Sequence, residues 1–416
     1  MPDRLDGSIA ILGSGLAGGN AAVALREEGF RGRVVLVGGE PTPPFGRPPL
    51  SKTYLRGEEG LGGWYVKPQA WYEANGVERI TDAGRAHVDA GAKLLLLGDG
   101  RRILYDRIAL CTGGRPRTPA IPGTELSGVH VLRTVADCES IKRGARPGRR
   151  AVVLGMGFIG AEVSASLRQL GVSVTAVFNG EGPLQAVLGP EVATVMAGVH
   201  RERGVELLGG DTIVAFEGDE RVERVVTRNG VRIECDLVVI GAGIEPDADA
   251  TAGSAVAIDN GILVDATCRT NVDGVFAAGD VANHLHPLFG RVRVEHYNNA
   301  EKMGRAVGRA MLGNESPYDY VHTFWSDQYD HTIEYVGHAT RWDAFVVRGS
   351  LEERRFLGFY IEDGILRAVV GLNRGGDPEL EADSELRACQ ELVARHAEVA
   401  ADVLADDRVD LRELAA

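Results

Sequence analysis

The sequence predicts an α/β protein in which two Rossmann-like dinucleotide-binding domains are accompanied by a smaller carboxyl-terminal α+β domain. One pattern occurs twice: a short apolar strand runs into a Gly-x-Gly-x-x-Gly turn, and the turn opens a helix. The two copies start near residues 8 and 151, roughly one domain length apart. Beyond about residue 320, apolar and polar residues alternate as in an antiparallel sheet, which indicates the third domain.

The first copy is typical of a βαβ unit. Ser8–Leu12 form the first strand and Gly13–Gly18 the turn. A helix then extends to Glu28, and Arg33–Val37 form the second strand. A turn of this kind carries no side chains where a pyrophosphate approaches, and it directs a helix N-terminus at the phosphates. An acid just past the second strand is expected to bind the ribose, and Glu40 fits this position; a surface acid in a turn is the alternative.

The second copy repeats this order and points to a second dinucleotide. Ala151–Leu154 are the strand and Gly155–Gly160 the turn, with a helix over about 161–170 and a strand over 172–177. Here Phe178 stands where an acid would hold the ribose hydroxyls of NADH, with Glu181 as a substitute. No Arg or Lys follows closely to pair with an NADPH phosphate, so the choice between NADH and NADPH stays open.

Two further glycine-rich crossings suggest domain boundaries. A strand over 107–112 runs into Gly113 and Gly114, and a strand over 237–240 runs into Gly241 and Gly243. The proline-rich segment 41–50 is expected to be an extended loop. Later elements are expected as a strand over 275–280, strands over 332–337 and 345–348, and a helix over about 383–396.

Composition narrows the functional class. The net charge is −14 and the pI is about 5.3, which disfavours nucleic acid and anionic membranes as partners. The five cysteines are widely spaced and form no Cys-x-x-Cys pair, so we expect reduced thiols and neither a redox dithiol nor a clustered metal site. Residues 1–7 are short and polar with no signal peptide, and no apolar run reaches about 18 residues, so a cytoplasmic protein is expected.

Six short motifs, taken together, carry a family resemblance over nearly the whole chain. They are Arg47-Pro48-Pro49-Leu50-Ser51-Lys52, Thr112-Gly113-Gly114-Arg115-Pro116-Arg117, Gly157-Phe158-Ile159-Gly160 with Glu162, Ala278-Gly279-Asp280, Arg293-Val294-Glu295-His296 and Phe324-Trp325-Ser326-Asp327-Gln328. By these motifs the chain resembles the oxygenase-coupled ferredoxin reductases, the group of putidaredoxin reductase and rubredoxin reductase, with apoptosis-inducing factor as a distant relative.

The resemblance implies the glutathione-reductase-type fold and a particular division of the chain. It implies an FAD-binding domain split over residues 1–112 and 245–320, an NAD(P)-binding domain over 113–244, and a carboxyl-terminal α+β domain over 321–416. Disulfide reductases of this fold carry a dithiol on the segment after the first βαβ unit. Here that segment ends in Ser51-Lys52 without a cysteine, so electrons are not expected to pass to a local dithiol.

The resemblance also implies site residues. Lys52 and Glu162 are expected as a catalytic ion pair near the reactive nitrogen of the flavin, where the lysine would stabilise negative charge. The implied FAD contacts are Gly13, Gly15, Leu16, Ala17, Gly18, Glu40, Arg47, Lys52, Arg85, Thr112, Gly113, Arg133, Gly279, Asp280, Glu295, His296, Tyr297 and Trp325. The implied NAD contacts are Gly155, Gly157, Phe158, Ile159, Gly160, Glu162, Gly241 and Gly243.

Each of these assignments has a plainer alternative. Lys52 is otherwise an exposed loop lysine, Glu162 an ordinary helix acid and Arg133 a surface arginine. Asp280 is otherwise a helix N-cap and Trp325 a core tryptophan.

Two positions depart from the family pattern. Many relatives have tryptophan where Tyr297 stands, and relatives often have an acid at Gly39, so FAD affinity depends on whether Glu40 substitutes.

The implied activity is an FAD-dependent ferredoxin reductase that takes a hydride from NADH (NADPH remaining possible) and passes single electrons to a 2Fe-2S ferredoxin. That ferredoxin would serve a monooxygenase or a dioxygenase. The alternatives are an NADH-responsive redox-sensing flavoprotein of the apoptosis-inducing-factor type, an NADH oxidase or peroxidase, which would need a cysteine near the flavin, and a monodehydroascorbate-type reductase. Monomer and homodimer both stay open.

Overall fold

The computed structural model of the protein describes residues 6–415, which form two compact units. Unit 1 contains the residues up to Arg47 together with Leu61–Arg115 and Ile244–Tyr320. Unit 2 contains Pro48–Gly60, Pro116–Gly243 and the residues from Val321 onward. The segment that carries Lys52 thus belongs with the second nucleotide-binding turn. The three-domain boundaries expected from the sequence stay a prediction, and residues 1–5 of the polar amino terminus lie outside the described residues.

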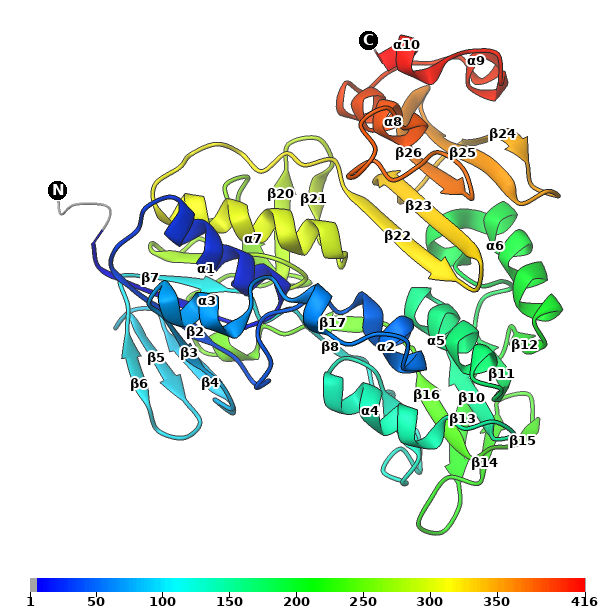
Figure 1. Ribbon diagram of the computed structural model, residues 1–416, viewed down its shortest axis with the longest axis horizontal. Helices are drawn as coiled ribbons and strands as arrows, with labels where there is room; N and C mark the ends of the chain where they lie inside the picture. The colour runs from blue at the N-terminus through cyan, green and yellow to red at the C-terminus, as the bar shows by residue number, and fades with distance from the viewer. Residues whose placement is uncertain (1–5, 416) are drawn as a thin grey trace. The chain divides into compact units, whose positions relative to one another are not determined.

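Unit 1 is built on a parallel sheet with strand order β19-β7-β1-β2-β3. Its strands are apolar runs buried on both faces, as parallel strands require. Helices α1 and α7 pack together on the sheet, and the antiparallel meander β4-β5-β6 lies on its other side (Figure 1). The bounds are β1 Ser8–Leu12, α1 Leu16–Glu27, β2 Arg33–Val37, β3 Val77–Ile80, β4 Ala86–Asp89, β5 Leu94–Leu97, β6 Arg102–Leu104, β7 Arg107–Leu110, β19 Val275–Ala277 and α7 Tyr297–Met311.

Smaller elements complete unit 1. A three-stranded sheet has the order β18-β20-β21, and the short pair β8–β17 lies where the chain leaves unit 1 and returns to it. The bounds are η2 Gly62–Trp64, α3 Gln69–Ala74, β8 Gly114–Pro116, β17 Ile244–Pro246, η3 Asp249–Thr251, β18 Ile262–Val264, β20 Ala282–His286 and β21 Gly290–Val292.

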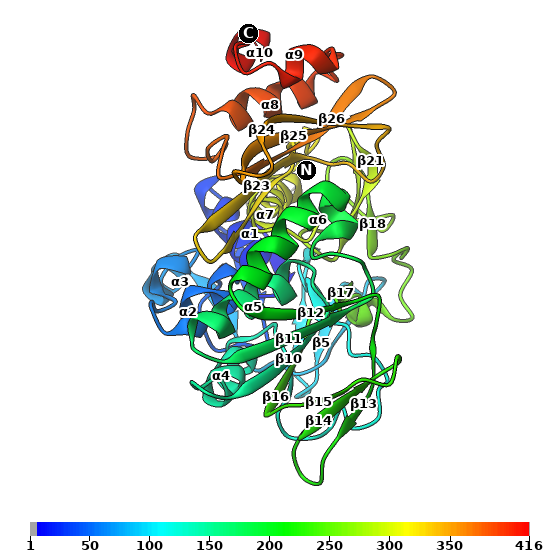
Figure 2. The same cartoon turned by 90° about the vertical axis from the view of Figure 1, so that its right-hand side faces the viewer.

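Unit 2 begins with a second parallel sheet, of order β12-β11-β10-β16-β9. The crossovers through α4, α5 and α6 all run in one direction across this sheet, so the right-handed rule places the three helices on the same face (Figure 2). The other face packs against the meander β13-β14-β15 in one apolar cluster. The bounds are η1 Pro48–Ser51, α2 Thr53–Arg56, β9 Val129–Val131, α4 Val135–Gly144, β10 Arg150–Leu154, α5 Phe158–Gln169, β11 Ser173–Phe178, α6 Gln185–Glu202, β12 Val205–Gly209, β13 Ile213–Glu217, β14 Arg224–Thr227, β15 Arg232–Glu234 and β16 Leu237–Ile240.

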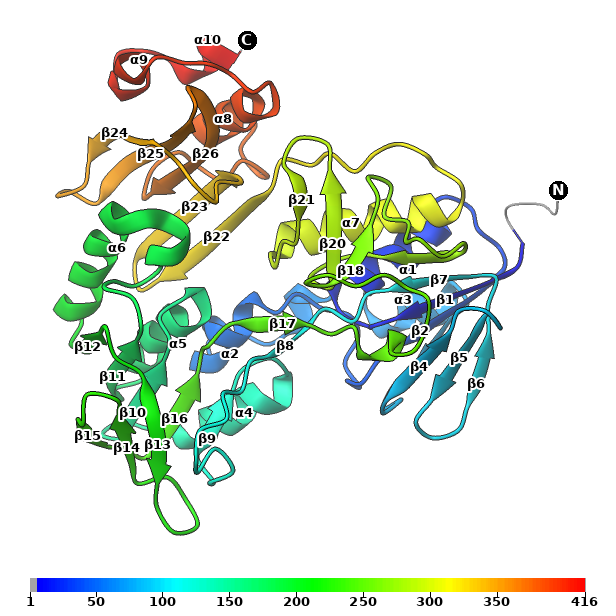
Figure 3. The ribbon, with the colours of Figure 1, turned by 180° about the vertical axis from the view of Figure 1, so that it is seen from behind.

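The carboxyl-terminal part of unit 2 is an antiparallel sheet of order β22-β23-β26-β25-β24, followed by three helices (Figure 3). Arg348 is fully buried here and donates to the carbonyl oxygens of Leu404, Val403 and Val409, which ties the last helices to the sheet. The bounds are β22 Thr323–Gln328, β23 His331–Gly337, β24 Ala344–Ser350, β25 Arg355–Glu362, β26 Ile365–Leu372, α8 Glu385–Ala394, α9 Ala401–Ala405 and α10 Leu411–Ala415.

Four sequence expectations need correction. The segment 41–50 is not extended throughout, because Pro48–Ser51 form a 3-10 turn that proline tolerates at its start. The second turn's helix begins at Phe158 rather than near residue 161, and the late helix is shorter than expected, at Glu385–Ala394. Asp280 precedes the strand β20 and no helix, so the N-cap interpretation is wrong.

No helix within residues 6–415 is both long enough and apolar enough to cross a membrane.

One half-buried acid makes the stability of the fold depend on pH. Burial, together with the carboxylates of Asp377, Asp327 and Glu381, raises the pKa of Glu334 on β23 to about 8. In the unfolded chain this carboxyl ionises near pH 4.5. Between these values the folded state keeps a proton that the unfolded state has lost, so stability falls as the pH rises through this window.

Replacing this acid by an uncharged amide should remove the penalty. We expect Glu334→Gln to raise the unfolding temperature at pH 8.5, by about 2–4 °C for each kcal/mol gained, and to change it little at pH 4.5. Thermal unfolding followed by circular dichroism at both pH values measures this, with Glu352→Gln, an exposed acid of the same sheet region, as the control. An equal gain at both pH values would contradict the assignment.

Candidate functional site

The two glycine-rich turns have the same internal construction. A Cβ atom on Gly18 would lie 1.9 Å from the carbonyl oxygen of Gly13, and one on Gly160 would lie 1.9 Å from that of Gly155. The first glycine of each turn has a positive φ, +110° at Gly13 and +92° at Gly155. These four glycines are therefore required for the strand to turn tightly into the helix.

The middle glycine of each turn has no such internal reason. A Cβ on Gly15 or Gly157 would meet no atom within 4 Å, and both residues have extended backbone that any residue adopts. Each precedes the first turn of a helix, where backbone N–H groups point outward. The missing side chain leaves room for a phosphate group at a helix N-terminus, so both turns fit a dinucleotide.

In unit 1 the predicted FAD residues gather at one edge of the parallel sheet. The carboxyl ends of parallel strands meet at the same edge, and segments after β1, β2, β3, β7 and β19 all lie there. These segments carry Gly13, Gly15, Leu16, Ala17, Gly18, Glu40, Arg85, Thr112, Gly113, Gly279 and Asp280. Ligands of open α/β sheets bind at this edge.

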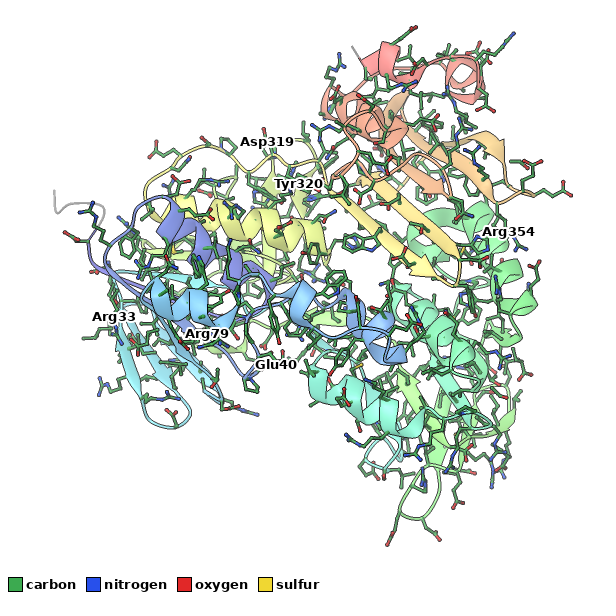
Figure 4. The ribbon with its side chains drawn as sticks, in the orientation of Figure 1. Arg33, Glu40, Arg79, Asp319, Tyr320 and Arg354 are labelled. Atoms are coloured by element: carbon green, nitrogen blue, oxygen red, sulfur yellow. The ribbon has the colours of Figure 1, made fainter. Side chains whose placement is uncertain are left out.

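Glu40 is held in place by neighbouring groups of unit 1. Its Oε1 accepts from Nη2 of Arg47 at 2.5 Å, and both side chains are about one quarter exposed (21% and 28%). Arg79, labelled with Glu40 in Figure 4, donates to the carbonyl oxygens of Pro41 and Thr42 and so fixes the loop that follows. An acid in this position can accept hydrogen bonds from ribose hydroxyls.

The residues around the start of α7 are also held by contacts within unit 1. His296 is the N-cap residue of α7, and Glu295 pairs with Arg293 at 2.6 Å. The ring of Tyr297 packs edge-on against Trp64, with centroids 6.1 Å apart, and burial raises the pKa of its hydroxyl to about 12. A Cβ on Gly46 would lie 2.4 Å from this ring, so the tyrosine fills space next to the backbone of the proline-rich loop.

In unit 2, the sheet edge that carries the second turn also carries Gly241 and Gly243 after β16 and Arg133 after β9. Arg133 is half-buried, and its backbone N–H donates to Asp137, the partner in the capping box of Thr134. Phe178 ends β11 and is buried, so this strand end offers an aromatic ring rather than a carboxylate.

Lys52 and Glu162 meet in unit 2 as the ion pair that the resemblance implies. Lys52 Nζ lies 2.7 Å from Glu162 Oε2, and the side chains are only 10% and 4% exposed. The exposed-loop interpretation of Lys52 is therefore wrong. Removing one partner of a buried pair leaves an uncompensated charge, at a cost of about 3–5 kcal/mol.

The segment that carries Lys52 is fixed to its surroundings through backbone carbonyls. The oxygen of Ser51 accepts from Ser166 Oγ on α5 at 2.7 Å, and that of Leu50 accepts from Cys138 Sγ on α4 at 3.2 Å. Arg56 also donates to Ser166 at 3.2 Å. The lysine thus extends from a well-anchored loop toward a helix of the nucleotide-binding sheet.

Sequence reasoning missed two further partners of Glu162. Its Oε2 also accepts from Ser51 Oγ at 2.5 Å, and its Oε1 accepts from Ser326 Oγ on β22 at 2.7 Å. Ser326 belongs to the motif around Trp325, and period-2 alternation places it on the buried face with Phe324, while Trp325 is half-buried on the other face. That alternation was the available signal.

Aromatic side chains pack together on α5 and β22, the two elements that carry Glu162 and its partner Ser326. Phe158, the first residue of α5, packs edge-on against Phe324, with ring centroids 4.9 Å apart, and Phe324 stacks on Tyr335 at 4.7 Å. Ile159, beside Phe158 in the second turn, is 43% exposed and lies at the surface of that turn. Because the side chains of Lys52 and Glu162 are only 10% and 4% exposed, the low local dielectric strengthens the attraction between them.

The cysteines offer no reactive thiol, and Cys138 contributes only its hydrogen bond to the carbonyl oxygen of Leu50. All five are buried and free, and burial raises the pKa of the thiols of Cys111, Cys138, Cys235 and Cys389 to about 12. A thiol at neutral pH in this state is a poor nucleophile. No group of three or more candidate metal ligands occurs among the described residues.

Two dinucleotide turns on two parallel sheets, a buried lysine–glutamate pair and no reactive dithiol define a pyridine-nucleotide-dependent flavin oxidoreductase. The family model described as "Pyridine nucleotide-disulphide oxidoreductase" matches residues 7–304, and the one described as "Reductase C-terminal" matches residues 323–415. The chain belongs to the pyridine nucleotide-disulphide oxidoreductase family.

Its relatives narrow the comparison. The chain is 34% identical to the ferredoxin reductase component of chlorobenzene dioxygenase from Cupriavidus sp. (strain PS12), over 98% of this chain and 97% of that protein. It is 34% identical to rhodocoxin reductase from Rhodococcus erythropolis, over 98% and 100%. The solved structure of a covalent putidaredoxin reductase–putidaredoxin complex matches with a TM-score of 0.92 at 31% identity, covering 98% of each chain.

Substitutions at the two middle glycines should weaken ligand binding without affecting folding. We expect Gly15→Ala to weaken FAD binding, and Gly157→Ala to raise the half-saturating NADH concentration, by about tenfold or more each, without loss of the fold. Gly18→Ala, with its Cβ 1.9 Å from a carbonyl oxygen, should instead lower the unfolding temperature of the apoprotein. Fluorescence titration with FAD and NADH and thermal unfolding measure these effects.

A surface glycine provides the matched control. A Cβ on Gly91, in the turn before β5, would make only an ordinary contact, 3.6 Å from Asp89, so Gly91→Ala should change neither binding nor stability. Unchanged FAD and NADH affinities in the two middle-glycine variants would show that these turns hold no dinucleotide.

Proposed function

We propose that the protein takes a hydride from NADH onto FAD and passes the electrons one at a time to a 2Fe-2S ferredoxin that serves a monooxygenase or a dioxygenase. The observation that carries the proposal is the buried Lys52–Glu162 pair on a segment without cysteine. Support also comes from relatives that align with this chain over nearly their whole length. These relatives are named as ferredoxin reductase components of dioxygenase systems.

FAD, when bound, supplies the redox chemistry itself, accepting two electrons and releasing them singly. The side chains of the protein would position the nicotinamide and stabilise the negative charge that develops in the reaction. The charge of Lys52 would face the position where negative charge develops, and Glu162 would orient the lysine and receive the carboxamide of the nicotinamide. A preorganised, water-poor environment makes such a charge effective.

The binding residues divide between the two turns. We propose that the turn at Gly13–Gly18 holds FAD together with Glu40, Arg47, Arg85 and Asp280. The other predicted FAD contacts of unit 1 are proposed to complete this set: Thr112, Gly113, Gly279, Glu295, His296 and Tyr297. For Lys52, Arg133 and Trp325, the role of FAD contacts is proposed from the family resemblance alone. The turn at Gly155–Gly160, with Glu162, Gly241 and Gly243, is proposed to hold NADH.

The preference for NADH over NADPH depends on the residues at and after the end of β11. Phe178 provides no acceptor for ribose hydroxyls, and no basic side chain follows it closely. Glu181 follows the end of β11, and its backbone N–H donates to Gln185 Oε1 at 3.0 Å. Its exposed carboxylate would repel the 2′-phosphate of NADPH. This favours NADH.

The buried, unpaired thiols fit a reducing compartment, and we place the protein in the cytoplasm on that basis.

A redox-sensing flavoprotein of the apoptosis-inducing-factor type is the second candidate function. The phenylalanine at position 178, where an acid is expected, is compatible with slow nucleotide turnover.

Anaerobic stopped-flow mixing tests the proposal. The purified yellow protein is mixed with NADH or with NADPH, flavin bleaching is followed, and an oxidised 2Fe-2S ferredoxin is added in a second mix. We expect fast bleaching by NADH, slower bleaching by NADPH, and rapid reoxidation by the ferredoxin. Slow bleaching to a long-lived long-wavelength absorption band that does not change when ferredoxin is added would contradict the proposal and favour the redox-sensing flavoprotein. Fast reoxidation by a monodehydroascorbate radical but not by ferredoxin would also contradict it.

A further inference from the structure

Glu162 lies at the end of a continuous buried chain of polar side chains. Ser326 donates to Glu162 Oε1 at 2.7 Å, and Gln328 Nε2 donates to Ser326 Oγ at 3.2 Å. Gln328 Oε1 is in turn 2.9 Å from Nε2 of His200 on α6. The three side chains beyond Glu162 belong to residues that are 0% exposed, so the chain is closed to solvent along this part.

The hydrogen bonds of this chain have one direction. Because the amide nitrogen of Gln328 donates to Ser326, its oxygen must accept, and His200 must therefore carry its proton on Nε2. His200 Nδ1 is then an acceptor, and the hydroxyl of Tyr329 lies 3.3 Å from it. Burial lowers the pKa of His200 to about 4, which keeps the ring neutral and the tautomer defined at neutral pH. Every donor in the chain points toward the carboxylate of Glu162.

The far end of the chain is built at a conformational cost. Tyr329 occupies the two-residue turn between β22 and β23 with φ = +60°, a left-handed conformation that a residue with a large side chain rarely adopts. In that conformation its ring packs against His200, with centroids 5.5 Å apart, and the guanidinium of Arg203 lies over it at 5.3 Å. A two-residue hairpin turn calls for a positive φ, and here this conformation brings the ring and hydroxyl of Tyr329 to His200.

We propose that Ser326, Gln328 and His200 are positioning residues for hydride transfer, because they hold the carboxylate of Glu162 in the orientation that keeps Lys52 in place. The proposal rests on the proposed role of the Lys52–Glu162 pair. Aligned hydrogen bonds polarise one another, so the two distant members strengthen the bond that Ser326 makes. Loss of Ser326 leaves Glu162 Oε1 without this partner, and loss of Gln328 weakens the same bond indirectly.

The arrangement in series gives a specific kinetic pattern. We expect Ser326→Ala to lower the limiting rate of flavin bleaching by NADH about tenfold and Gln328→Leu about threefold. The double variant should be no slower than Ser326→Ala alone, since Gln328 acts only through Ser326. Half-saturating NADH should change less than the limiting rate, because the glycine turn proposed to bind the dinucleotide is untouched and only the contact through Glu162 is altered. Ser326→Thr, which keeps a hydroxyl, should recover most of the rate.

A spectroscopic readout tests the chain without turnover. In ¹⁵N-histidine-labelled protein, the ring signals of His200, assigned by their loss in His200→Gln, should show a protonated Nε2 and an unprotonated Nδ1 from pH 5.5 to 8. Gln328→Leu should change these shifts. Gln390→Leu is the control, because Gln390 is a buried glutamine of the same unit that donates to the carbonyl of Val321 and not to the chain.

The outcomes are distinguishable. A charged or Nδ1-protonated His200, additive losses in the double variant, or an equal slowing by Gln390→Leu would overturn the proposal. If Ser326→Ala fails to fold, Gln328→Leu and the His200 spectra decide. A wild-type protein that NADH does not bleach would contradict the proposed function instead, and the His200 tautomer would still test the chain.

Discussion

A lysine and a glutamate removed from water lose their hydration, and only close pairing with additional hydrogen bonds offsets that loss. Lys52 and Glu162 satisfy this condition, with 2.7 Å between the charged atoms and serine hydroxyls on both carboxylate oxygens. The pair constrains three parts of unit 2 together: the loop that carries Lys52, helix α5 after the dinucleotide turn, and strand β22 of the antiparallel sheet. The carbonyl contacts of Leu50 and Ser51 hold the loop beside α4 and α5, and the Phe158–Phe324 packing joins α5 to β22.

The two units share one structural feature, a parallel sheet with a glycine-rich turn after the first strand of its βαβ unit. In both units a parallel sheet ends in a glycine turn whose outer glycines are required by backbone contacts and whose middle glycine leaves open space. An acid follows the second strand in unit 1, at Glu40, and a buried phenylalanine ends it in unit 2, at Phe178. The two sheets therefore share a fold and differ in how they can recognise a ribose, which is consistent with two different dinucleotides.

The parts of this structure that local sequence patterns encode were predictable. Apolar strands followed by glycine turns identified both parallel sheets, and alternation identified the carboxyl-terminal sheet, because burial imposes these periods directly. The ion pair came from a family resemblance, since nothing local connects Lys52 with Glu162 across more than one hundred residues. The serine partners of Glu162 and the chain through Gln328 to His200 depend on side chains from four separate segments, and no local pattern encodes that. Prolines suggested an extended loop, yet Pro48–Ser51 form a turn whose last two residues, Leu50 and Ser51, are anchored to α4 and α5 through their carbonyl oxygens.

The central claim, that the buried Lys52–Glu162 pair controls electron entry, is tested most directly by the limiting rate of anaerobic flavin bleaching by NADH in Lys52→Met. The double variant Lys52→Met with Glu162→Gln accompanies it, because it leaves no lone buried charge. The account predicts that both variants still bind FAD and are bleached at least about a hundredfold more slowly than the wild type. A limiting rate within about twofold of the wild type in the flavin-loaded double variant would show that the pair serves structure alone and would contradict the account.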